Sequence, residues 1–370
     1  MDRRETERLL EAIRQAQATG ERVAIATVVR VSGSAYRREG TQMLVHENGD
    51  YECALSGGCL EPAVADAAAR VIATGDPVVV RYDLTDDSLW GLGIGCSGAV
   101  DIRIERLEDD AITREWLKVL ERGDAAALVT PLSGVSGQLL VRAIGESIGH
   151  LADSTIEHHA IVHARARLGT SNAQSGPARI EGAEIFYQVN TPAPELVIFG
   201  AGHDTVPLAH LAWMQGFAVT IVDVRETFLT ADRLPNAALV RAHFGEFADA
   251  VTVRDGAFVL VMNHHVERDQ ESLRFALESG AAYIGILGPR SRYEKMLASL
   301  AARGCAPPAS SLSRVRSPVG LSLGAETPPE IAVSILAELL AIRRGFDGGF
   351  LSGSVGSLHR PGERRLVARS

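Results

Sequence analysis

A glycine turn between an apolar strand and a helix constrains the fold of this chain more than any other feature. Gly200-Ala201-Gly202 directly follows the apolar run 196–199, and a helical pattern begins a few residues later. Glycines at such a place permit a tight turn and let the backbone approach a pyrophosphate, which a helix N-terminus attracts. Asp223 follows Gly202 by 21 residues, at the end of the next apolar run, where a carboxylate accepts from a ribose hydroxyl. The pattern predicts a Rossmann-type nucleotide-binding unit.

Apolar strands alternate with helical segments through the rest of the C-terminal half, which predicts a parallel sheet covered on both faces. Further strands are predicted to end at residues 263–265 and 288–290. Ligands of such sheets bind outside the carboxyl ends of the strands, so we expect His203, His264 and Arg290 to converge on one cleft. Arg290 is a candidate phosphate ligand, and either histidine can transfer protons near neutral pH. The alternative is that all three are ordinary polar residues at strand ends.

Two positions leave the ligand of this half open. The third glycine of the dinucleotide pattern is replaced by Thr205, which predicts looser packing of helix on strand or a different ligand. Arg225, two residues after Asp223, is placed to pair with a 2′-phosphate, so NADP fits as well as NAD. In a further interpretation, the domain keeps a Rossmann-like fold but no longer binds a nucleotide.

Two glycine-rich loops of the N-terminal part each contain a cysteine. Gly57, Gly58 and Cys59 lead into a helix, whose N-terminus favours the thiolate that binds soft metals or accepts sulfur. Cys96 lies in the second loop, and the glycines of both loops permit close approach of a ligand. Arg37, in a third loop, is a candidate phosphate or carboxylate ligand. The alternatives are small buried thiols at sharp bends and an ordinary solvated arginine.

The order of predicted elements divides the chain into four regions. These are an α+β domain over residues 1–108, a connecting subdomain over 109–190, a Rossmann-like doubly wound domain over 195–345 and a flexible tail over 346–370. Within the first region, Asn48-Gly49 between two short strands predicts a hairpin with a type I′ turn. The chain is therefore expected to be an α/β protein.

Composition and cysteine spacing exclude several classes of protein. The net charge of −9 and the lack of a basic stripe argue against nucleic-acid binding. The four cysteines form no C-x-x-C pair and have no zinc-type spacing. The N-terminus has no apolar leader, and no run of 18 apolar residues occurs, so we expect a cytoplasmic protein with reduced thiols and no membrane span. No nucleophile-elbow pattern is present, which disfavours a hydrolase.

Taken together, these loops resemble the XdhC/CoxI family, and the resemblance covers most of the chain in the same order. The N-terminal matches are Ser32-Gly33-Ser34, Arg37, Gly40, Met43, Gly57-Gly58-Cys59-Leu60-Glu61 and Gly95-Cys96-Ser97-Gly98. The C-terminal matches are Phe199-Gly200-Ala201-Gly202-His203, Asp223-Val224-Arg225, residues 283–290, residues 318–321 and residues 324–328. One departure is that residues 94–98 read Ile-Gly-Cys-Ser-Gly, where the family is associated with a Cys-Gly-Gly form.

The resemblance implies an accessory protein rather than a turnover enzyme. Members of the family bind the molybdenum cofactor (molybdopterin), protect it while its terminal sulfur is installed, and pass it to the apoenzyme of a xanthine dehydrogenase- or CO dehydrogenase-type molybdenum hydroxylase. They work with a cysteine desulfurase. The resemblance makes Cys59 and Cys96 candidates for sulfur or metal handling. The alternative is an NAD(P)-dependent oxidoreductase that uses Gly200, Gly202, Asp223 and the nearby histidines. Homodimerisation is expected only because it is the commonest assembly.

Overall fold

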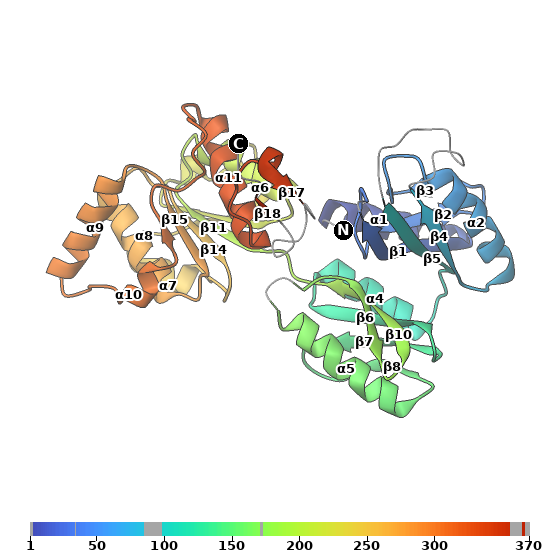
Figure 1. The fold of residues 1–370 in the computed structure, drawn as a ribbon. Helices are drawn as coiled ribbons and strands as arrows, with labels where there is room; N and C mark the ends of the chain where they lie inside the picture. Colours follow the sequence, from blue (N-terminus) through green and yellow to red (C-terminus); the bar gives the residue numbers. More distant parts are fainter. Residues whose placement is uncertain (1–2, 34, 85–97, 171–172, 356–364, 367–370) are drawn as a thin grey trace. The chain divides into compact units, whose positions relative to one another are not determined.

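The structure is a computed structural model that forms two compact units, Met1–Pro192 and Ala193–Ser370. It describes residues 3–33, 35–84, 98–170, 173–355 and 365–366 (Figure 1). The division falls within the proline-containing stretch 191–194.

The first sheet of the N-terminal unit is antiparallel and has the strand order β3-β2-β1-β5-β4. Its elements are α1 (Arg3–Thr19), β1 (Val23–Gly33), β2 (Gln42–His46), β3 (Tyr51–Glu52), α2 (Glu61–Thr74), β4 (Val78–Asp83) and β5 (Gly98–Arg106). Side chains alternate along β1, so that Ala24 and Ala26 pack with α2 while Ile25 packs with α1. The two helices therefore cover opposite faces of the sheet.

The hairpin between β2 and β3 forms, but its turn is not the predicted type I′. Among the described residues, Gly49 has a positive φ of 88° and Asn48 does not. The Asn48 side chain instead accepts a hydrogen bond from the Asp50 N–H at 2.9 Å, and the His46 N–H donates to the Asp50 carbonyl at 2.9 Å. An asparagine side chain that mimics a backbone turn replaces the left-handed backbone that a type I′ turn needs.

A second antiparallel sheet, with the order β8-β7-β6-β10-β9, completes the N-terminal unit. Its elements are α4 (Ala111–Arg122), β6 (Ala126–Ser133), β7 (Gly137–Arg142), β8 (Ile148–Leu151), α5 (Ser154–Leu168), β9 (Gly176–Ile180) and β10 (Ala183–Asn190). The α5 helix, in a stretch that the sequence pattern left unassigned, begins after Asp153, whose carboxylate accepts from the Thr155 and Ile156 N–H groups. The two sheets are joined by Arg30, which pairs with both Asp101 and Glu184, and by Gln188, which donates to the Gly40 carbonyl at 2.9 Å.

The C-terminal unit contains a parallel sheet with the order β13-β12-β11-β14-β15-β16, the order of a Rossmann fold. Its strands are β11 (Glu195–Phe199), β12 (Ala218–Asp223), β13 (Ala237–Arg241), β14 (Phe258–Val261), β15 (Tyr283–Ile286) and β16 (Val315–Arg316). Its α-helices are α6 (Thr205–Met214), α7 (Phe247–Ala250), α8 (Val266–Glu278), α9 (Arg290–Ala302), α10 (Ala309–Leu312) and α11 (Pro328–Arg344). Short 3-10 helices are η1 (Glu226–Phe228), η2 (Phe244–Glu246) and η3 (Leu351–Gly353), and two further short strands are β17 (Ser354–Val355) and β18 (Arg365–Leu366).

Helices cover both faces of this sheet, as the alternation of apolar strands and helices predicted (Figure 1). One core joins α6 and α11 to one face, and another joins α7, α8 and α9 to the opposite face. The α11 helix begins with a capping box, in which Thr327 and Glu330 satisfy each other's backbone N–H groups. The predicted α/β class with a doubly wound parallel sheet is confirmed.

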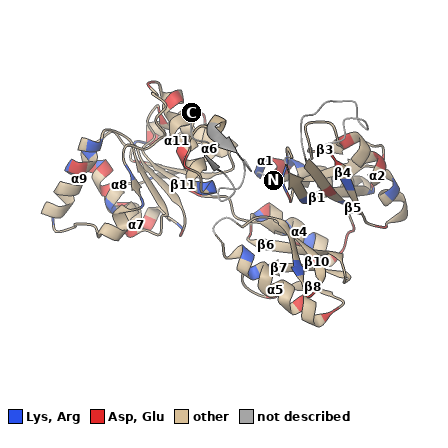
Figure 2. Cartoon of the chain, in the orientation of Figure 1, with Lys and Arg blue, Asp and Glu red and all other residues tan. Residues whose placement is uncertain are grey.

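Acidic and basic side chains are interspersed on the helices of both units (Figure 2). Many form exposed pairs within one helix, such as Arg3 with Glu7 and Arg274 with Glu278. Solvent screens pairs of this kind, and each contributes less than about 1 kcal/mol. The stability of the fold therefore depends mainly on the apolar cores of the three sheets.

Candidate functional site

The glycine turn of the C-terminal unit lies where the sequence pattern predicted it, between β11 and α6. Gly200 has a φ of 114°, and a Cβ atom there would lie 2.4 Å from the Met262 carbonyl oxygen. No larger residue fits this position without moving β14, because both the backbone conformation and the space require glycine. Thr205, at the third glycine position, is fully buried, and its hydroxyl donates to the Gly200 carbonyl at 2.8 Å. The threonine hydroxyl thus takes part in closing the turn, and whether Thr205 goes with a different ligand stays a prediction.

Asp223 reaches the same turn, but its carboxylate is already engaged by the protein. It accepts from the Ala201 N–H at 2.8 Å, from the Arg225 N–H at 2.9 Å, and from the Arg225 guanidinium at 2.6 and 3.0 Å. Burial raises the pKa of Asp223, but these hydrogen bonds outweigh burial and hold the pKa below its ordinary value. The side chain is only 1% exposed. A ribose hydroxyl therefore reaches this carboxylate only if Arg225 moves away.

An aromatic ring with two arginines flanks the turn. The Arg225 guanidinium carbon lies 4.0 Å from the centre of the Phe228 ring, and that of Arg233 lies 4.8 Å from it. Arg233 also donates to the Phe228 carbonyl at 2.6 Å and to the Ala201 carbonyl at 3.3 Å. His203 meets the ring edge-on, with centroids 6.2 Å apart. Cation–π contacts of this kind hold both arginines in place. Sequence reasoning missed Arg233, since no motif marks its position.

His264 pairs with a carboxylate that the predicted site did not include. Its Nε2 lies 2.7 Å from Asp204 Oδ2, which joins the carboxyl end of β14 to the N-terminus of α6. His264 has a φ of 57°, a left-handed conformation that is uncommon outside glycine and is often found at functional positions. Asp204 is buried, and its Oδ1 has no hydrogen-bond partner among the described residues. The position of Asp204 directly after the glycine turn was the available sequence signal.

The third set of contacts at this edge of the sheet is made by a buried carboxylate, that of Asp269. Asp269, in the first turn of α8, accepts from the Asn263 N–H at 2.9 Å, and it pairs with Arg292. Burial raises the pKa of Asp269 and outweighs the lowering by Arg292 and Asn263. Arg290 points elsewhere: its side chain is 70% exposed, and its guanidinium pairs with Glu294 on its own helix at 3.2 Å. The structure brings Arg292 rather than Arg290 into contact with the residues after β14.

The cysteine loop of the N-terminal unit is stabilised by Ser56 and Glu61. The Ser56 hydroxyl accepts from the Gly58, Cys59 and Leu60 N–H groups at 3.1–3.2 Å and donates to Glu61 Oε2 at 2.5 Å. Glu61 is fully buried and accepts from the Leu55, Ser56 and Leu60 N–H groups. Burial raises the pKa of Glu61, but the hydrogen bonds from Ser56 and these amides hold it below its ordinary value.

The glycines of this loop and its thiol are its least crowded parts among the described residues. Among the described residues, no atom outside the adjacent residues lies within 4 Å of the position that a Cβ of Gly57 or Gly58 would occupy. Cys59 is half-buried, and its Sγ lies 3.3 Å from the Ser56 hydroxyl oxygen. Cys96 lies outside the described residues. The loop thus combines a fixed backbone with open space beside a thiol.

Arg37 is paired with a carboxylate of α1. Its Nη2 lies 2.6 Å from both carboxylate oxygens of Glu5, and the two side chains are about equally half-buried. This pair ties the third loop to the first helix. An incoming anion would have to compete with Glu5 for the guanidinium.

Neither a metal cluster nor a membrane helix occurs in the part of the chain that the structure describes. Within these residues, no group of three or more His, Cys, Asp and Glu side chains is arranged to hold a metal ion. No helix in the same part of the chain has the length and apolar character to cross a membrane.

Comparison with known proteins gives matches over most of the chain. Residues 196–339 match the model of the XdhC Rossmann domain, and residues 16–83 match that of the XdhC and CoxI family. The chain is 33% identical to a Bacillus subtilis protein named as a probable subunit of xanthine dehydrogenase, over 91% of this chain and 97% of that protein. It is 24% identical to the molybdenum cofactor insertion chaperone PaoD of Escherichia coli, over 89% of this chain and 86% of the relative.

The fold also matches a solved structure. A crystal structure described as a xanthine dehydrogenase from Bacillus halodurans superposes with a TM-score of 0.74 at 31% identity. The match covers 91% of this chain and 96% of the other. Both units therefore occur together, in the same order, in these proteins.

Proposed function

Since this chain belongs to the XdhC and CoxI family, we propose that it is an insertion factor for the molybdenum cofactor of a molybdenum hydroxylase. The observation that carries the proposal is the match of both units to a relative named as part of a xanthine dehydrogenase, over 97% of that relative. The insertion chaperone PaoD, which matches over 86% of its length, points in the same direction. The family expected from the glycine and cysteine loops is confirmed.

In the proposed role, the protein binds the cofactor as cargo, shields it while the terminal sulfur is installed, and passes it to the apoenzyme. The client is an enzyme of the xanthine dehydrogenase or CO dehydrogenase type, and a cysteine desulfurase supplies the sulfur. We place this work in the cytoplasm. A homodimer is the assembly we expect.

The cysteine loop suits such cargo. Gly57 and Gly58 leave open space beside the backbone, and the Cys59 thiol is half-buried rather than sealed. Thiolates are the protein ligands that soft metal centres prefer and the groups that accept sulfur. Cys59, with Cys96 as its proposed partner, therefore contacts the molybdenum or its sulfur ligand in our proposal. Ser56 and Glu61 position the loop and do not contact the cargo.

The oxidoreductase alternative has less support at its binding site. Its sheet order and glycine turn are present, but the Asp223 carboxylate that would hold the ribose is bonded to Arg225 and Ala201. A nucleotide would have to displace Arg225 from both Asp223 and Phe228. We therefore assign the cofactor-delivery role to the protein and treat absence of pterin together with NAD(P) binding as the outcome that would contradict it.

The test is retention of cofactor by protein purified without oxygen from a host that makes molybdenum cofactor. Bound molybdenum and the fluorescence of the oxidised pterin are measured together for wild type, Cys59→Ser, Cys96→Ser and the double variant. Cys305→Ser is the matched control, because Cys305 is exposed and lies in the other unit. We expect pterin in wild type and in the control, and a clear loss in the double variant with folding retained.

Two results would argue against the proposal. Equal pterin and equal activation of a client apoenzyme in all variants would remove the cysteines from the role. No pterin in wild type, together with micromolar binding of NAD or NADP in a titration, would favour the oxidoreductase.

A further inference from the structure

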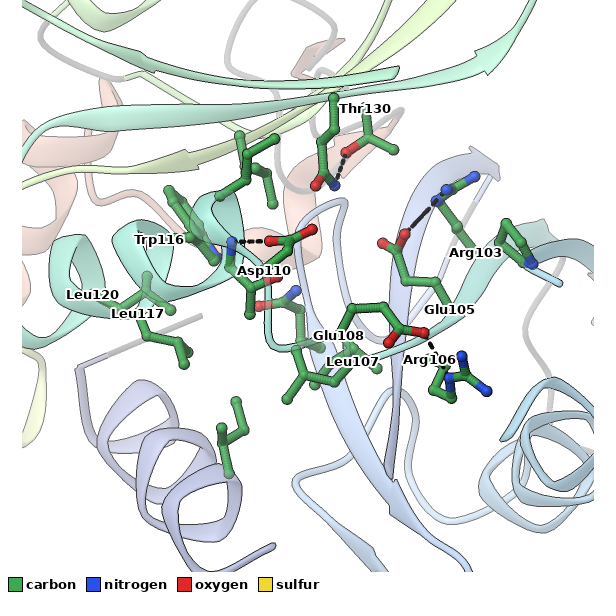
Figure 3. A pocket seen from close by; sticks show the side chains of 18 of the residues that line it. Arg103, Glu105, Arg106, Leu107, Glu108, Asp110, Trp116, Leu117, Leu120 and Thr130 are labelled. Atoms are coloured by element: carbon green, nitrogen blue, oxygen red, sulfur yellow. Dashed lines mark hydrogen bonds and ion pairs between the residues drawn. The ribbon is translucent and has the colours of Figure 1, made fainter. Parts of the chain in front are cut away.

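The N-terminal unit contains a cavity of about 270 Å³ between its two sheets (Figure 3). Strands β1, β2 and β5 of the first sheet and β6 and β7 of the second line it, together with α1 and α4. Much of its wall is apolar, and this part includes Leu9, Ile13, Ile25, Trp116, Leu117 and Leu120. Its volume is close to the lower end of the range for small-molecule pockets, about 300 Å³.

The polar groups of the cavity form two similar pairs, one on each sheet. On the first sheet, Gln42 of β2 stands opposite Thr27 of β1, and its Nε2 lies 3.2 Å from the Thr27 hydroxyl. On the second sheet, Gln138 of β7 makes the same contact with the Thr130 hydroxyl of β6 at 3.0 Å (Figure 3). Each glutamine lines the cavity and, among the residues described, has no partner for its second amide atom. Two neutral amides are therefore available to a ligand.

Four of the five charged groups at the cavity form two ion pairs. Arg103 pairs with Glu105 at 3.0 Å, and Arg106 pairs with Glu108 at 2.6 Å (Figure 3). The remaining charge of the lining is Asp110, whose carboxylate caps α4 by accepting from the Thr113 N–H at 2.7 Å. The lining thus presents no free cation to an anion. A phosphate group would lose its hydration without gaining a counter-charge, which is costly.

The cavity and the cysteine loop lie on opposite faces of the first sheet. Ile25 faces the cavity, whereas its neighbours Ala24 and Ala26 pack in the core that includes α2 and Cys59. Because side chains of successive residues in a strand point to opposite faces, the sheet itself separates the two places. A ligand of the cavity would not contact the Cys59 thiol.

We propose that this cavity is a second ligand site, for a small uncharged nitrogen heterocycle with a lactam or amide edge. The free Oε1 of one glutamine can accept from the N–H of such an edge, and the second Nε2 hydrogen of the other can donate to its carbonyl. The leucine, isoleucine and tryptophan side chains cover its apolar faces. The site is independent of the proposed cofactor delivery. Since it joins the two sheets of one unit, its occupation would fix them against each other.

The test is calorimetric titration of the full chain with hypoxanthine, an uncharged two-ring lactam. Indole has a similar two-ring shape without the lactam, and inosine monophosphate carries the same lactam with a phosphate. We expect saturable binding of hypoxanthine, and binding of both comparators weaker by about fivefold or more, the worth of one hydrogen bond. Absence of hypoxanthine binding, or equal binding of indole, would overturn the proposal.

Two substitutions localise the binding. Gln138→Leu and Gln42→Leu each remove one amide, and each is expected to weaken hypoxanthine binding by about fivefold. Gln138 is partly exposed, so its variant should fold even if the buried Gln42→Leu does not. The control is Gln15→Leu, at an exposed position of α1 where the amide contacts only Glu11. Unchanged affinity in folded Gln138→Leu, or an equal loss in the control, would contradict a site in this cavity.

Discussion

The glycine turn after β11 and the cysteine loop before α2 are built on the same plan. In each, glycines precede a helix and a buried carboxylate of the chain accepts several backbone N–H groups, Asp223 in one case and Glu61 in the other. In each, hydrogen bonds hold the pKa of that carboxyl below its ordinary value in spite of burial. In each loop, a carboxylate of the chain itself thus satisfies backbone N–H groups.

The two loops differ in the space that they leave. Gly200 is pressed against the Met262 carbonyl, and Arg225 covers Asp223. Gly57 and Gly58 face open space, and a half-buried thiol lies beside them. A glycine turn is therefore a packing requirement in one unit, whereas in the other a methyl group at Gly57 would contact no described atom. The two loops nevertheless have a similar sequence pattern, in which glycines precede a helix.

The largest effect that separates the two loops is expected from alanine at their glycines. In Gly200→Ala the new Cβ would lie 2.4 Å from a backbone oxygen at a φ of 114°, so we expect a loss of about 4 kcal/mol or more in unfolding free energy. In Gly57→Ala the new methyl meets no atom of the described residues within 4 Å apart from its chain neighbours, and we expect a change below about 0.5 kcal/mol. Urea unfolding of both variants measures the difference. Similar losses in the two would show that the cysteine loop is packed as tightly as the Rossmann turn.

Removal of the internal anion of the cysteine loop is expected to have the next largest effect. Glu61→Gln replaces a buried carboxylate that accepts three backbone N–H groups, and a loss of about 2 kcal/mol is expected. Thermal unfolding at neutral pH gives this value. The exposed Glu47→Gln is the control, since its side chain pairs with Arg22 at the surface. A loss no larger than in the control would show that Ser56 alone supports the loop.

The depressed pKa values of Asp223 and Glu61 predict how stability depends on pH. Each carboxyl has a lower pKa in the folded than in the unfolded state, so its contribution is present above the unfolded value of about 4. The contribution is lost as the pH falls through the folded pKa. The free energy of unfolding should thus decrease on acidification below about pH 4.5, and less steeply in Glu61→Gln. An equal slope in the variant would contradict the assignment.

Much of the fold was predictable because it depends on local patterns. Apolar strands alternating with helices, a glycine after β11 and the capping box of Thr327 with Glu330 all act within a few residues of the chain. The second antiparallel sheet was predicted only in part. Its α5 helix has apolar residues that follow no clear helical face, and its edge strands β8 and β9 are short.

The candidate site was less predictable, because its contacts join residues far apart in sequence. The ends of β14 and β15 were located to within a few residues. No pattern indicates that Asp204 would meet His264, or that Arg292 rather than Arg290 would reach Asp269. Arg225, two residues after Asp223, was interpreted as a ligand of a 2′-phosphate. In the structure its guanidinium donates to the Asp223 carboxylate instead. Three-dimensional packing decides which hydrogen-bond donor contacts a given carboxylate.

A smaller effect is expected from uncovering Asp223. In Arg225→Ser the carboxylate loses its guanidinium partner and becomes free to accept from a ribose hydroxyl. A hydrogen bond to a charged group is worth about 1.5 kcal/mol or more, so NAD should bind about tenfold more tightly to this variant than to wild type. Arg241→Ser, which removes an exposed arginine of the same unit, is the control. If NAD bound more tightly to wild type than to Arg225→Ser, Arg225 would itself be a nucleotide ligand. The Rossmann turn would then leave space for a ligand, as the cysteine loop does.

The smallest effect on folding is expected at the thiol itself. In Cys59→Ser a hydroxyl replaces a half-buried sulfur whose hydrogen-bonding contact is the Ser56 hydroxyl, and Ser56 keeps its three backbone N–H donors. We expect a change within about 0.5 kcal/mol in unfolding free energy, similar to Cys305→Ser. Thermal unfolding of the two variants beside wild type measures it. A loss as large as that of Glu61→Gln would mean that the thiol supports the loop, and a loss of cofactor in Cys59→Ser could then not be assigned to chemistry at the sulfur. A small change would leave Cys59 free for that chemistry, as the open space beside Gly57 and Gly58 indicates.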